Sequence, residues 1–579
     1  MKISLVAPAA SLFAGVVSAA TGPFLTAVDS QTWIIGNEIW NMTQGPKYGV
    51  KLYYKDHDCV GNAVGHYVSY NGAANDLAWT SARIVKNGTH SGVPFIDILF
   101  TAAEGDMHWV IFSNQHGSYQ YFVNRALPTL GEFRTLWRLD NTTFPNGRTV
   151  TKDGVLPPLA DYLPENKIQD ETWRTPDGKG YITKYDWTSW ILAQDFYGVY
   201  GEETGFGSWY INPGKDYYNG DETKQELMVH RESATGDAVQ LNMLHGTHFM
   251  VSSSDVFPQG KMWGPWLWYL NDGSRSDALS RSKTEFASWP YPWLEDEPYQ
   301  TRGSVSGQLT LSDGRPASHA AVFLGDTLPS NKSSLDQGST YYYTATTDAS
   351  GHFTIPHVRV GSYGLQAWSG NNSAIEDVSS TFTLPSLTVS KNKETDLGAL
   401  TWKISEKKKL FQVGSFDRFS YGFAHGGDPW QHGLVSSCPA NLTYRVGCST
   451  TKDWCFGQST KGNWTIKFWN PATANANKSA TLIVSLAGYS SGSSSTIWVN
   501  DAVVGNLTSG SVGSDGLVTH GLASDPSLYR SATAAGEWRY FEFEVKPGVL
   551  KEGKNEVKFQ LTRETQWHGF MWDAIKLEW

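Results

Sequence analysis

The stretch Glu556-Val-Lys-Phe-Gln-Leu561 alternates polar and apolar side chains, and Phe541-Glu-Phe-Glu-Val545 alternates in the same way. A period of two is typical of a β-strand that packs one face on a core and exposes the other to water. Pro547-Gly548 supplies turn residues between the two stretches, and Thr496-Ile-Trp-Val499 is a further strand candidate upstream. Together these patterns predict a jelly-roll β-sandwich over residues 403–579.

Strands are also predicted in the two regions upstream, but the composition and the length of the predicted strands differ between these regions. Residues 21–300 are the richest in Trp and Tyr, and segments such as Trp109-Val-Ile-Phe112 lie between glycine and asparagine turns, which predicts a large β-sandwich. From residue 301 to residue 402 the strands are short and alternate around tight turns such as Ser312-Asp313-Gly314, which predicts a small immunoglobulin-like or fibronectin type III-like sandwich. The predicted fold class is therefore all-β, with three sandwiches in a row.

The composition of the chain narrows the kinds of partner that it can bind. The formal net charge is −10, which argues against nucleic acid because nucleic acid requires a basic face. Any polyanionic partner must therefore meet a local basic cluster. The chain has 25 Trp and 27 Tyr but only 18% charged residues. Flat aromatic rings exposed in a groove suit sugars, although the more frequent role of any single Trp is to fill a core.

The N-terminus has the features of a targeting segment. A basic residue, Lys2, is followed by an apolar run, Ile3–Val17, and then by small side chains. This order predicts a signal peptide over residues 1–20 and a secreted, extracellular protein. The alternative is a transmembrane anchor, which is disfavoured because the run is short and has no charged flank after it. Nine Asn-x-Ser/Thr triplets agree with a secreted glycoprotein, and we expect no membrane partner.

The four cysteines are unevenly spaced, at Cys59, Cys438, Cys448 and Cys455. The last three lie close together without a Cys-x-x-Cys pair, so a zinc site is not indicated. In an oxidising compartment this spacing predicts a short-loop disulfide among them. Cys59 is far away in sequence and is either an interdomain partner or a free thiol.

Three local motifs point to a family. They are Glu132-Phe-Arg-Thr-Leu-Trp-Arg138-Leu, Tyr181-Ile-Thr-Lys184-Tyr and Met243-Leu-His245-Gly246, and the C-terminal segment Trp572-Asp-Ala-Ile-Lys-Leu577 accompanies them. In this order they resemble the fungal rhamnogalacturonan lyases of polysaccharide lyase family 4 over nearly the whole chain. The resemblance implies a catalytic sandwich, a fibronectin-like domain and a carbohydrate-binding-like jelly roll. It also implies that the partner is a pectic polysaccharide, rhamnogalacturonan I, and we expect a monomer.

The resemblance implies a β-elimination in which Arg138, Lys184 and His245 are catalytic. Removal of the C5 proton of a uronate adds negative charge beside a carboxylate, so the carboxylate must be neutralised, and the planar fork of Arg138 suits this. Lys184 is the candidate base, because a nearby arginine and partial burial both favour its neutral form. His245 is the candidate acid for the leaving O4, since a histidine titrates near working pH.

Each of these residues has a simpler interpretation. A lone lysine on a strand, such as Lys184, is usually a solvated surface residue. Arg138 could pair with a neighbouring carboxylate. His245 could be a turn histidine, and His248 is a rival acid three residues further on. Only the matched order of the three motifs favours the catalytic interpretation.

Two further hypotheses come from other classes of protein. A glycoside hydrolase needs two carboxylates across one glycosidic bond, and no motif pairs them here. A non-catalytic carbohydrate-binding protein is disfavoured by the three motifs. The acidic turn at residues 217–222 could bind calcium, but a polar turn is the simpler interpretation. We therefore expect no metal or other cofactor in the chemistry and leave structural calcium elsewhere open.

Overall fold

The computed structural model describes most of the chain after the N-terminal segment, and the predicted signal peptide lies outside the described residues. The described residues are 21–579 except 72–74, 247–255, 330–333, 428–435, 472–477, 491, 510–518, 523–527, 529–533 and 565–566. Among the described residues, no helix combines the length and apolarity that a membrane crossing requires.

The first domain is a sandwich of two nine-stranded sheets, both of them antiparallel throughout. The first sheet runs β1 (Phe24–Ala27), β2 (Trp33–Gly36), β3 (Trp40–Gln44), β4 (Gly49–Tyr54), β6 (Gly65–Tyr70), β11 (Glu132–Leu139), β22 (Ala238–Gly246) and β21 (Val229–Arg231), with β5 (His57–Asp58) on β4. The second runs β13 (Asp153–Val155), β12 (Asn146–Arg148), β18 (Tyr197–Gly201), β19 (Phe206–Ile211), β23 (Met262–Asn271), β10 (Gly117–Asn124), β9 (Gly105–Phe112), β8 (Val93–Thr101) and β7 (Ser81–His90).

Tryptophan rings fill the space between these two sheets. Trp137 of β11 and Trp268 of β23 stack with their ring centroids 4.7 Å apart, and Trp109 of β9 contacts both. All three are fully buried. The alternation of Phe133, Thr135, Trp137 and Leu139 along β11 therefore sets the inner face of the first sheet.

Smaller elements decorate the edges of the first domain. They are the sheet of β14 (Lys167–Gln169), β15 (Thr172–Arg174) and β16 (Tyr181–Thr183), the pair of β17 (Thr188–Trp190) and β20 (Gln225–Leu227), the 3-10 turns η1 (Leu159–Asp161), η2 (Pro164–Asn166) and η3 (Lys184–Trp187), and the helices α1 (Arg275–Ser288) and α2 (Glu297–Gln300). Ser274 caps α1 by accepting from the backbone N–H of Asp277, and the helix packs on β19 and β23.

The second domain is a small sandwich of a three-stranded and a four-stranded sheet. The first has β27 (His352–Arg359), β24 (Arg302–Leu311) and β30 (Glu394–Trp402), and the second has β26 (Tyr343–Thr346), β25 (Ala320–Gly325), β28 (Gly361–Ser369) and β29 (Phe382–Val389), with the 3-10 turn η4 (Ser334–Asp336) between β25 and β26 in sequence. Strands β24 and β30 are parallel, so the last strand returns beside the first and closes the domain.

The third domain is a larger sandwich of a five-stranded and a six-stranded sheet. The first has β31 (Lys409–Gly414), β41 (Phe570–Glu578), β35 (Ala480–Tyr489) and β39 (Arg539–Val545), with β33 (Gly457–Gln458) on β41. The second has β32 (Leu442–Arg445), β34 (Gly462–Asn470), β40 (Gly553–Arg563), β36 (Ser494–Val499), β37 (Ala502–Ser509) and β38 (Thr519–Leu522), and the turn η6 (Thr451–Asp453) lies between β32 and β33. The predicted all-β fold class is confirmed, whereas the domain limits at residues 300 and 402 stay predictions.

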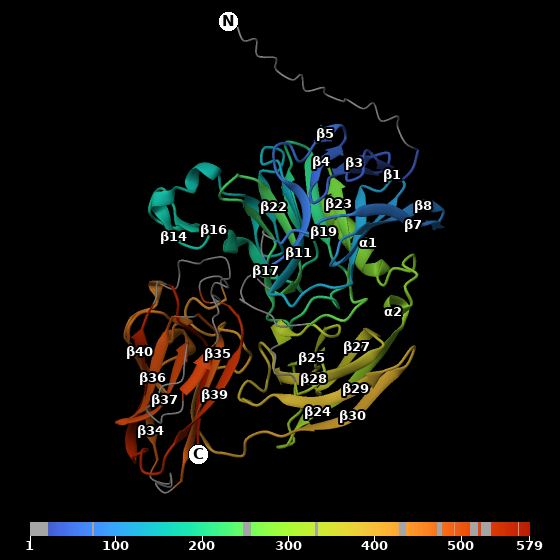
Figure 1. The fold of residues 1–579 in the computed structure, drawn as a ribbon. Coiled ribbons are helices and arrows are strands. Elements are labelled where there is room, and N and C mark those ends of the chain that lie inside the picture. Colours follow the sequence, from blue (N-terminus) through green and yellow to red (C-terminus); the bar gives the residue numbers. More distant parts are fainter. Residues whose placement is uncertain are drawn as a thin grey trace, which may run out of the picture.

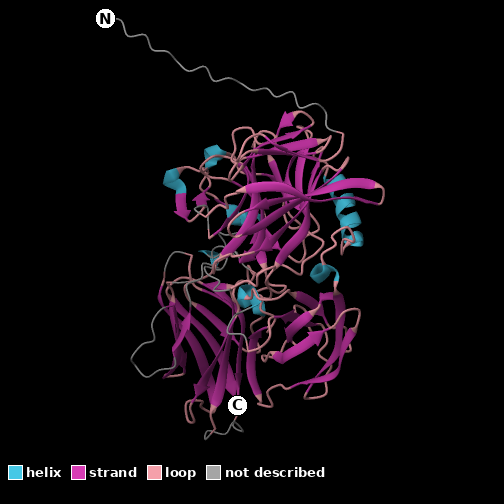
Figure 2. Cartoon of the chain, turned by 45° about the vertical axis from the view of Figure 1, so that its right-hand side comes forward, coloured by secondary structure: helices cyan, strands magenta, loops and turns pink. Residues whose placement is uncertain are grey.

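The three sandwiches touch one another. In Figure 1 the first domain lies above, and the second (yellow) and third (orange to red) lie side by side beneath it. The turned view in Figure 2 keeps the same arrangement and shows how few helices the fold contains. Each of the two lower domains is joined to the first through a buried arginine.

The first joint is an ion-pair triad. Asp216 of the first domain accepts from Arg302 Nη1 at 2.9 Å and from Arg359 Nε at 2.9 Å, and both arginines belong to the second domain. All three side chains are almost fully buried. The single carboxylate of Asp216 is thus shared by two guanidinium groups, and both arginines depend on it as their buried counter-charge.

The second joint collects residues from all three domains. The guanidinium of Arg418 lies 3.5 Å from the ring centroid of Trp368 and 4.0 Å from that of Trp538. Its nearest carboxylate, Asp221 of the first domain, is 3.5 Å away. Trp368 in turn donates to Glu222 at 3.0 Å. Arg418 is thus held mainly between two indole faces.

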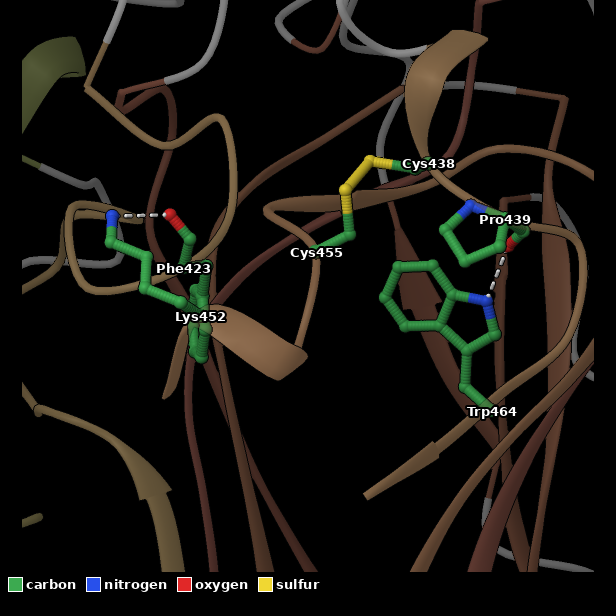
Figure 3. The surroundings of a disulfide bond; sticks show 6 residues. All are labelled: Phe423, Cys438, Pro439, Lys452, Cys455 and Trp464. Carbon is green, nitrogen blue, oxygen red and sulfur yellow. Dashed lines mark hydrogen bonds between the residues drawn. A yellow bond between two sulfur atoms is a disulfide. The ribbon is translucent and has the colours of Figure 1, made fainter. Parts of the chain in front are cut away.

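The disulfide lies in the third domain, between Cys438 and Cys455 (Figure 3). Beside it, Trp464 donates to the backbone oxygen of Pro439 at 2.9 Å. The prediction of a short-loop disulfide among the last three cysteines is confirmed. Cys59 is buried and forms no disulfide in the described part of the chain, and neither does the exposed Cys448.

Candidate functional site

Arg138 lies on the outer face of the first sheet. Alternation along β11 turns Phe133, Thr135 and Trp137 into the core, so Arg138 and its neighbour Arg134 point the other way. The Arg138 Nη2 atom is 2.9 Å from Glu232 Oε2, and its Nε donates to the hydroxyl of Tyr67 at 3.2 Å.

One edge of the Arg138 guanidinium has a looser contact. Its Nη1 is 3.8 Å from Asp237, which is beyond hydrogen-bond distance. Burial raises the pKa of Asp237 above its ordinary value, so this second carboxylate resists ionisation. The side chain of Arg138 keeps 20% of its surface exposed. A guanidinium in this state can donate from its Nη1 edge to a further carboxylate.

Lys184 begins the turn η3, at the border between the first and third domains. The side chain of the preceding Thr183 accepts from the N–H of Tyr185 and fixes the turn, and the Tyr185 ring packs in the core of the third domain. The Lys184 side chain is half-buried, with its Nζ 5.3 Å from the centroid of that ring. The Lys184 amine therefore lies against an aromatic ring while part of its surface stays open to solvent.

A chain of contacts links Lys184 to Arg138. The backbone N–H of Lys184 donates to the backbone oxygen of Glu171, and the Glu171 carboxylate accepts from Ser233 at 3.0 Å. Ser233 directly follows Glu232, the ion-pair partner of Arg138. The structure therefore places Lys184 and Arg138 at the same end of the sheet.

His245 lies at the opposite end of the same strand pair. It is the cross-strand partner of Phe133, whereas Arg138 is the partner of Val239. Five residues of β11 separate the two positions, which corresponds to about 17 Å. His245 is also fully buried, and its ring packs edge-on against Phe257 of the core. The structure thus does not bring His245 together with Arg138.

Another histidine, His230 of β21, occupies the place that sequence reasoning assigned to His245. His230 is paired with Val239, and Val239 is paired with Arg138, so all three point to the outer face. The Nε2 atom of His230 is 4.0 Å from Glu232. The strand that carries it packs against η3, which begins with Lys184. The signal in the sequence that could have found His230 is its spacing of two residues from Glu232, which directly follows β21, because this spacing brings both side chains to the same side of an extended chain.

A buried lysine near His245 was also missed. Lys224 donates to Asn219 Oδ1 at 2.6 Å and to the backbone oxygen of Gly246 at 2.9 Å, and burial lowers its pKa to about 8. Its side chain is only 1% exposed, so it does not meet a polymer directly. Its contacts suit the positioning of the strand end at His245 and Gly246.

In the acidic turn at residues 217–222, the carboxylate of Asp221 already binds other protein groups. Asp221 accepts from the backbone and hydroxyl of Thr223 and from Ser334, and it faces Arg418. Within the described ranges, no group of three or more His, Cys, Asp or Glu side chains is arranged to hold a metal ion.

Known proteins resemble the chain over most of its length. Residues 302–397 match polysaccharide lyase family 4, domain II, and residues 409–577 match polysaccharide lyase family 4, domain III. A rhamnogalacturonate lyase of Dickeya dadantii is 31% identical and covers 88% of this chain and 84% of its own. Rhamnogalacturonate lyase B of Emericella nidulans is 24% identical and covers 90% and 89%.

These relatives come from a bacterium and from fungi, so they do not single out the fungal type that the motifs resemble. Among solved structures, (S)-allantoin synthase aligns with 22% of this chain and 51% of its own at 14% identity. Its TM-score is 0.14, which is too low to indicate a shared fold.

Proposed function

The chain belongs to polysaccharide lyase family 4, and on that premise we propose that it cleaves rhamnogalacturonan I, a pectic polysaccharide, by β-elimination. The linkage cleaved joins rhamnose to galacturonate through O4, and the bond that breaks within it is the C4–O4 bond of the galacturonate. The observation that carries this proposal is the coverage of more than four fifths of both chains by two relatives named rhamnogalacturonate lyases.

Atoms and electrons balance in this elimination without the addition of water or an oxidant. A base removes the C5 proton of the galacturonate, and the electrons of that bond form a C4–C5 double bond. The C4–O4 bond breaks, and O4 leaves on the rhamnose with the electron pair and takes up a proton. The products are a 4,5-unsaturated uronate end and a new rhamnose end.

We propose that Arg138 binds the carboxylate of the uronate and that Lys184 removes the C5 proton. The open Nη1 edge of Arg138 suits a carboxylate, and its neutralisation makes the C5 proton more acidic. Lys184 is tied to the same end of the sheet through Glu171. A base must be neutral to take up the C5 proton, and the candidate amine of Lys184 is half-buried at this border of the first domain. The proposed chemistry uses no metal.

For the acid that protonates O4, we propose His230. The sequence predicts His245, but the roughly 17 Å along the strand, with the buried ring on the core face, separates that residue from Arg138. His230 shares a face with Arg138, and Glu232 lies between them, 2.9 Å from Arg138 and 4.0 Å from His230. A protonated imidazole on this face could donate to the leaving O4.

The test follows the ultraviolet absorbance of the unsaturated uronate. We expect Lys184→Ala and His230→Ala each to lower kcat by about 10²–10⁴-fold, the usual contribution of a general base or acid. Lys179→Ala, an exposed lysine in the hairpin that leads to Lys184, is the matched control and should retain activity. His245→Ala should lower stability while the folded fraction keeps its turnover.

Three results would change the assignment. New reducing ends without ultraviolet absorbance would identify a hydrolase. Full activity in Lys184→Ala would remove the proposed base. If His245→Ala abolished turnover in a folded protein while His230→Ala did not, the acid would be His245, as the sequence predicts.

We also propose that the protein is secreted after removal of residues 1–20 and acts as a monomer. The Cys438–Cys455 disulfide supports an oxidising destination, because such bonds persist outside the reducing cytosol.

A further inference from the structure

One aromatic ring stands out on the surface of the third domain. Trp469 of β34 is 66% exposed, whereas its sequence neighbours Phe468 and Asn470 are buried. The alternation of β34 therefore directs Trp469 to the outer face of the six-stranded sheet. A single exposed ring is ordinary on its own, so the binding argument depends on the groups that surround it.

Cations surround this ring. Lys554 of β40 is the direct cross-strand partner of Trp469, and Lys467 lies two residues before it on the same face. Arg445 of β32 is in turn the partner of Lys467. Paired residues on neighbouring strands lie on one face about 5 Å apart. The three cations and the ring thus form one continuous patch in a chain whose net charge is −10.

The patch forms one wall of a groove, and hydrogen bonds hold the residues at the bottom of this groove in place. The groove has a volume of about 530 Å³, which is the size of a typical ligand site. The buried side chain of Asn555 donates to the backbone oxygens of Lys551 and Gly553 and accepts from Asn500. Gly553 lies against the Trp469 ring, because a Cβ atom at this position would be in ordinary van der Waals contact with the ring, 3.5 Å from its nearest carbon.

The charge of the groove favours anions. Its lining has four basic side chains, Arg445, Lys467, Lys551 and Lys554, against two carboxylates, Asp501 and Glu556. Lys551 pairs with Asp501 at 3.1 Å, but both side chains are more than 60% exposed, so this pair is weak and can be displaced. The excess of positive charge remains around Trp469.

The same face continues along the sheet. Lys558 of β40 is four residues beyond Lys554, about 14 Å along the strand. Its Nζ lies 4.7 Å from the centroid of the Trp498 ring. Trp498 belongs to β36, the next strand in the sheet. An elongated surface with a second lysine and tryptophan suits a polymer better than a single sugar.

We propose that this outer face, formed by Trp469, Lys467, Lys554 and Arg445, binds uronate-containing polysaccharide separately from the site of cleavage. The open ring stacks on a sugar face, and the cations pair with carboxylates of the same chain. The choice of a uronate polymer rests on the proposed function, because that function supplies the anionic sugar. The site would hold the polymer while the first domain cleaves it.

The experiment is affinity electrophoresis of the full chain in gels that contain rhamnogalacturonan I, polygalacturonate or a neutral galactan. Every variant carries Lys184→Ala so that the polymer stays intact. We expect Trp469→Ala to weaken binding to both uronate polymers about tenfold, the size of effect typical of a central aromatic contact. Lys467→Gln with Lys554→Gln should weaken it similarly and reduce its salt dependence.

The matched control for charge is Lys391→Gln with Lys393→Gln, two exposed lysines of the second domain. It should bind like the parent. Parent-like retardation of the Trp469→Ala variant would overturn the proposal, and so would equal binding of the galactan. Retardation needs no catalysis, so this outcome is separate from a failure of the lyase assignment.

A kinetic arm in the active protein completes the test. Trp469→Ala should raise KM for the long polymer and leave kcat and KM unchanged for a short oligosaccharide. An equal change for both substrates would instead indicate a general structural effect and contradict the proposed site.

Discussion

Arg359 and Arg418 are both buried arginines at domain joints, yet their surroundings differ. Arg359 shares the carboxylate of Asp216 with Arg302 at hydrogen-bond distance. Arg418 has its nearest carboxylate at 3.5 Å and relies on the faces of Trp368 and Trp538. The first joint is therefore an electrostatic lock, and the second is largely an aromatic clamp.

The protonation of the neighbouring acids follows this difference. Burial alone would raise the pKa of Asp216, but Arg359 and Arg302 together lower it below its ordinary value. At the other joint, burial and the neighbouring Asp221 raise the pKa of Glu222 to about 8. Burial also lowers the pKa of Arg418. A charged lock and a partly neutral clamp should respond differently to substitution and to pH.

The largest effect is expected from breaking the lock. Asp216→Asn keeps the shape of the side chain but leaves Arg302 and Arg359 without a buried counter-charge. We expect a loss of about 3–5 kcal/mol in the free energy of unfolding, the usual cost of an uncompensated buried charge. Urea unfolding of the variant measures it, with the exposed Glu406→Gln as control. A loss no larger than that of the control would refute the lock.

A smaller effect is expected from opening the clamp. Arg418→Met fills the space between the two indoles but removes the cation, while Asp221 still accepts hydrogen bonds from Thr223 and Ser334. The expected loss is about 2 kcal/mol, in the range of a desolvated cation–π contact. Urea unfolding under the same conditions gives the comparison. A loss larger than that of Asp216→Asn would reverse the ranking of the two joints.

The smallest effect is a pH dependence at the clamp. An unfolded glutamate loses its proton near 4.5, whereas folded Glu222 keeps it to about 8. The stabilisation is therefore complete at low pH and is lost as the pH rises through this window. We expect about 1 kcal/mol, since Glu222 keeps some solvent contact. Glu222→Gln should flatten this slope, as followed by the melting temperature, and an unchanged slope would exclude Glu222 as its source.

Much of the fold could be predicted because a strand can be recognised from the alternation of polar and apolar residues in its own segment. The alternation of 541–545 and 556–561 became β39 and β40, and Trp109 entered the core as single tryptophans usually do. The disulfide among the last three cysteines was confirmed for a similar reason, because a short loop limits the choices. Local pattern carries this information without knowledge of the partner strand.

The arrangement of the site could not be predicted in this way. Whether Arg138 meets His230 or His245 depends on the register of β11, β22 and β21, and register is set by pairing between segments far apart in the chain. The sequence offered three motifs in order but no distances between them. The ion pair of Arg138 with Glu232 could not be predicted either, because Glu132 and Asp140 are nearer in the sequence and were equally plausible partners.

The clamp around Arg418 has a consequence for how the chain is made on the ribosome. Asp221 and Glu222 emerge early, Trp368 follows, and Arg418 comes only after the second domain is complete. The backbone N–H of Arg418 then binds Asp573, close to the C-terminal Trp579, at 2.9 Å. The two lower domains can fold as they appear, but the three-way joint is complete only after Asp573 has been made, so until then Asp221 and Glu222 lack the cation in its final place.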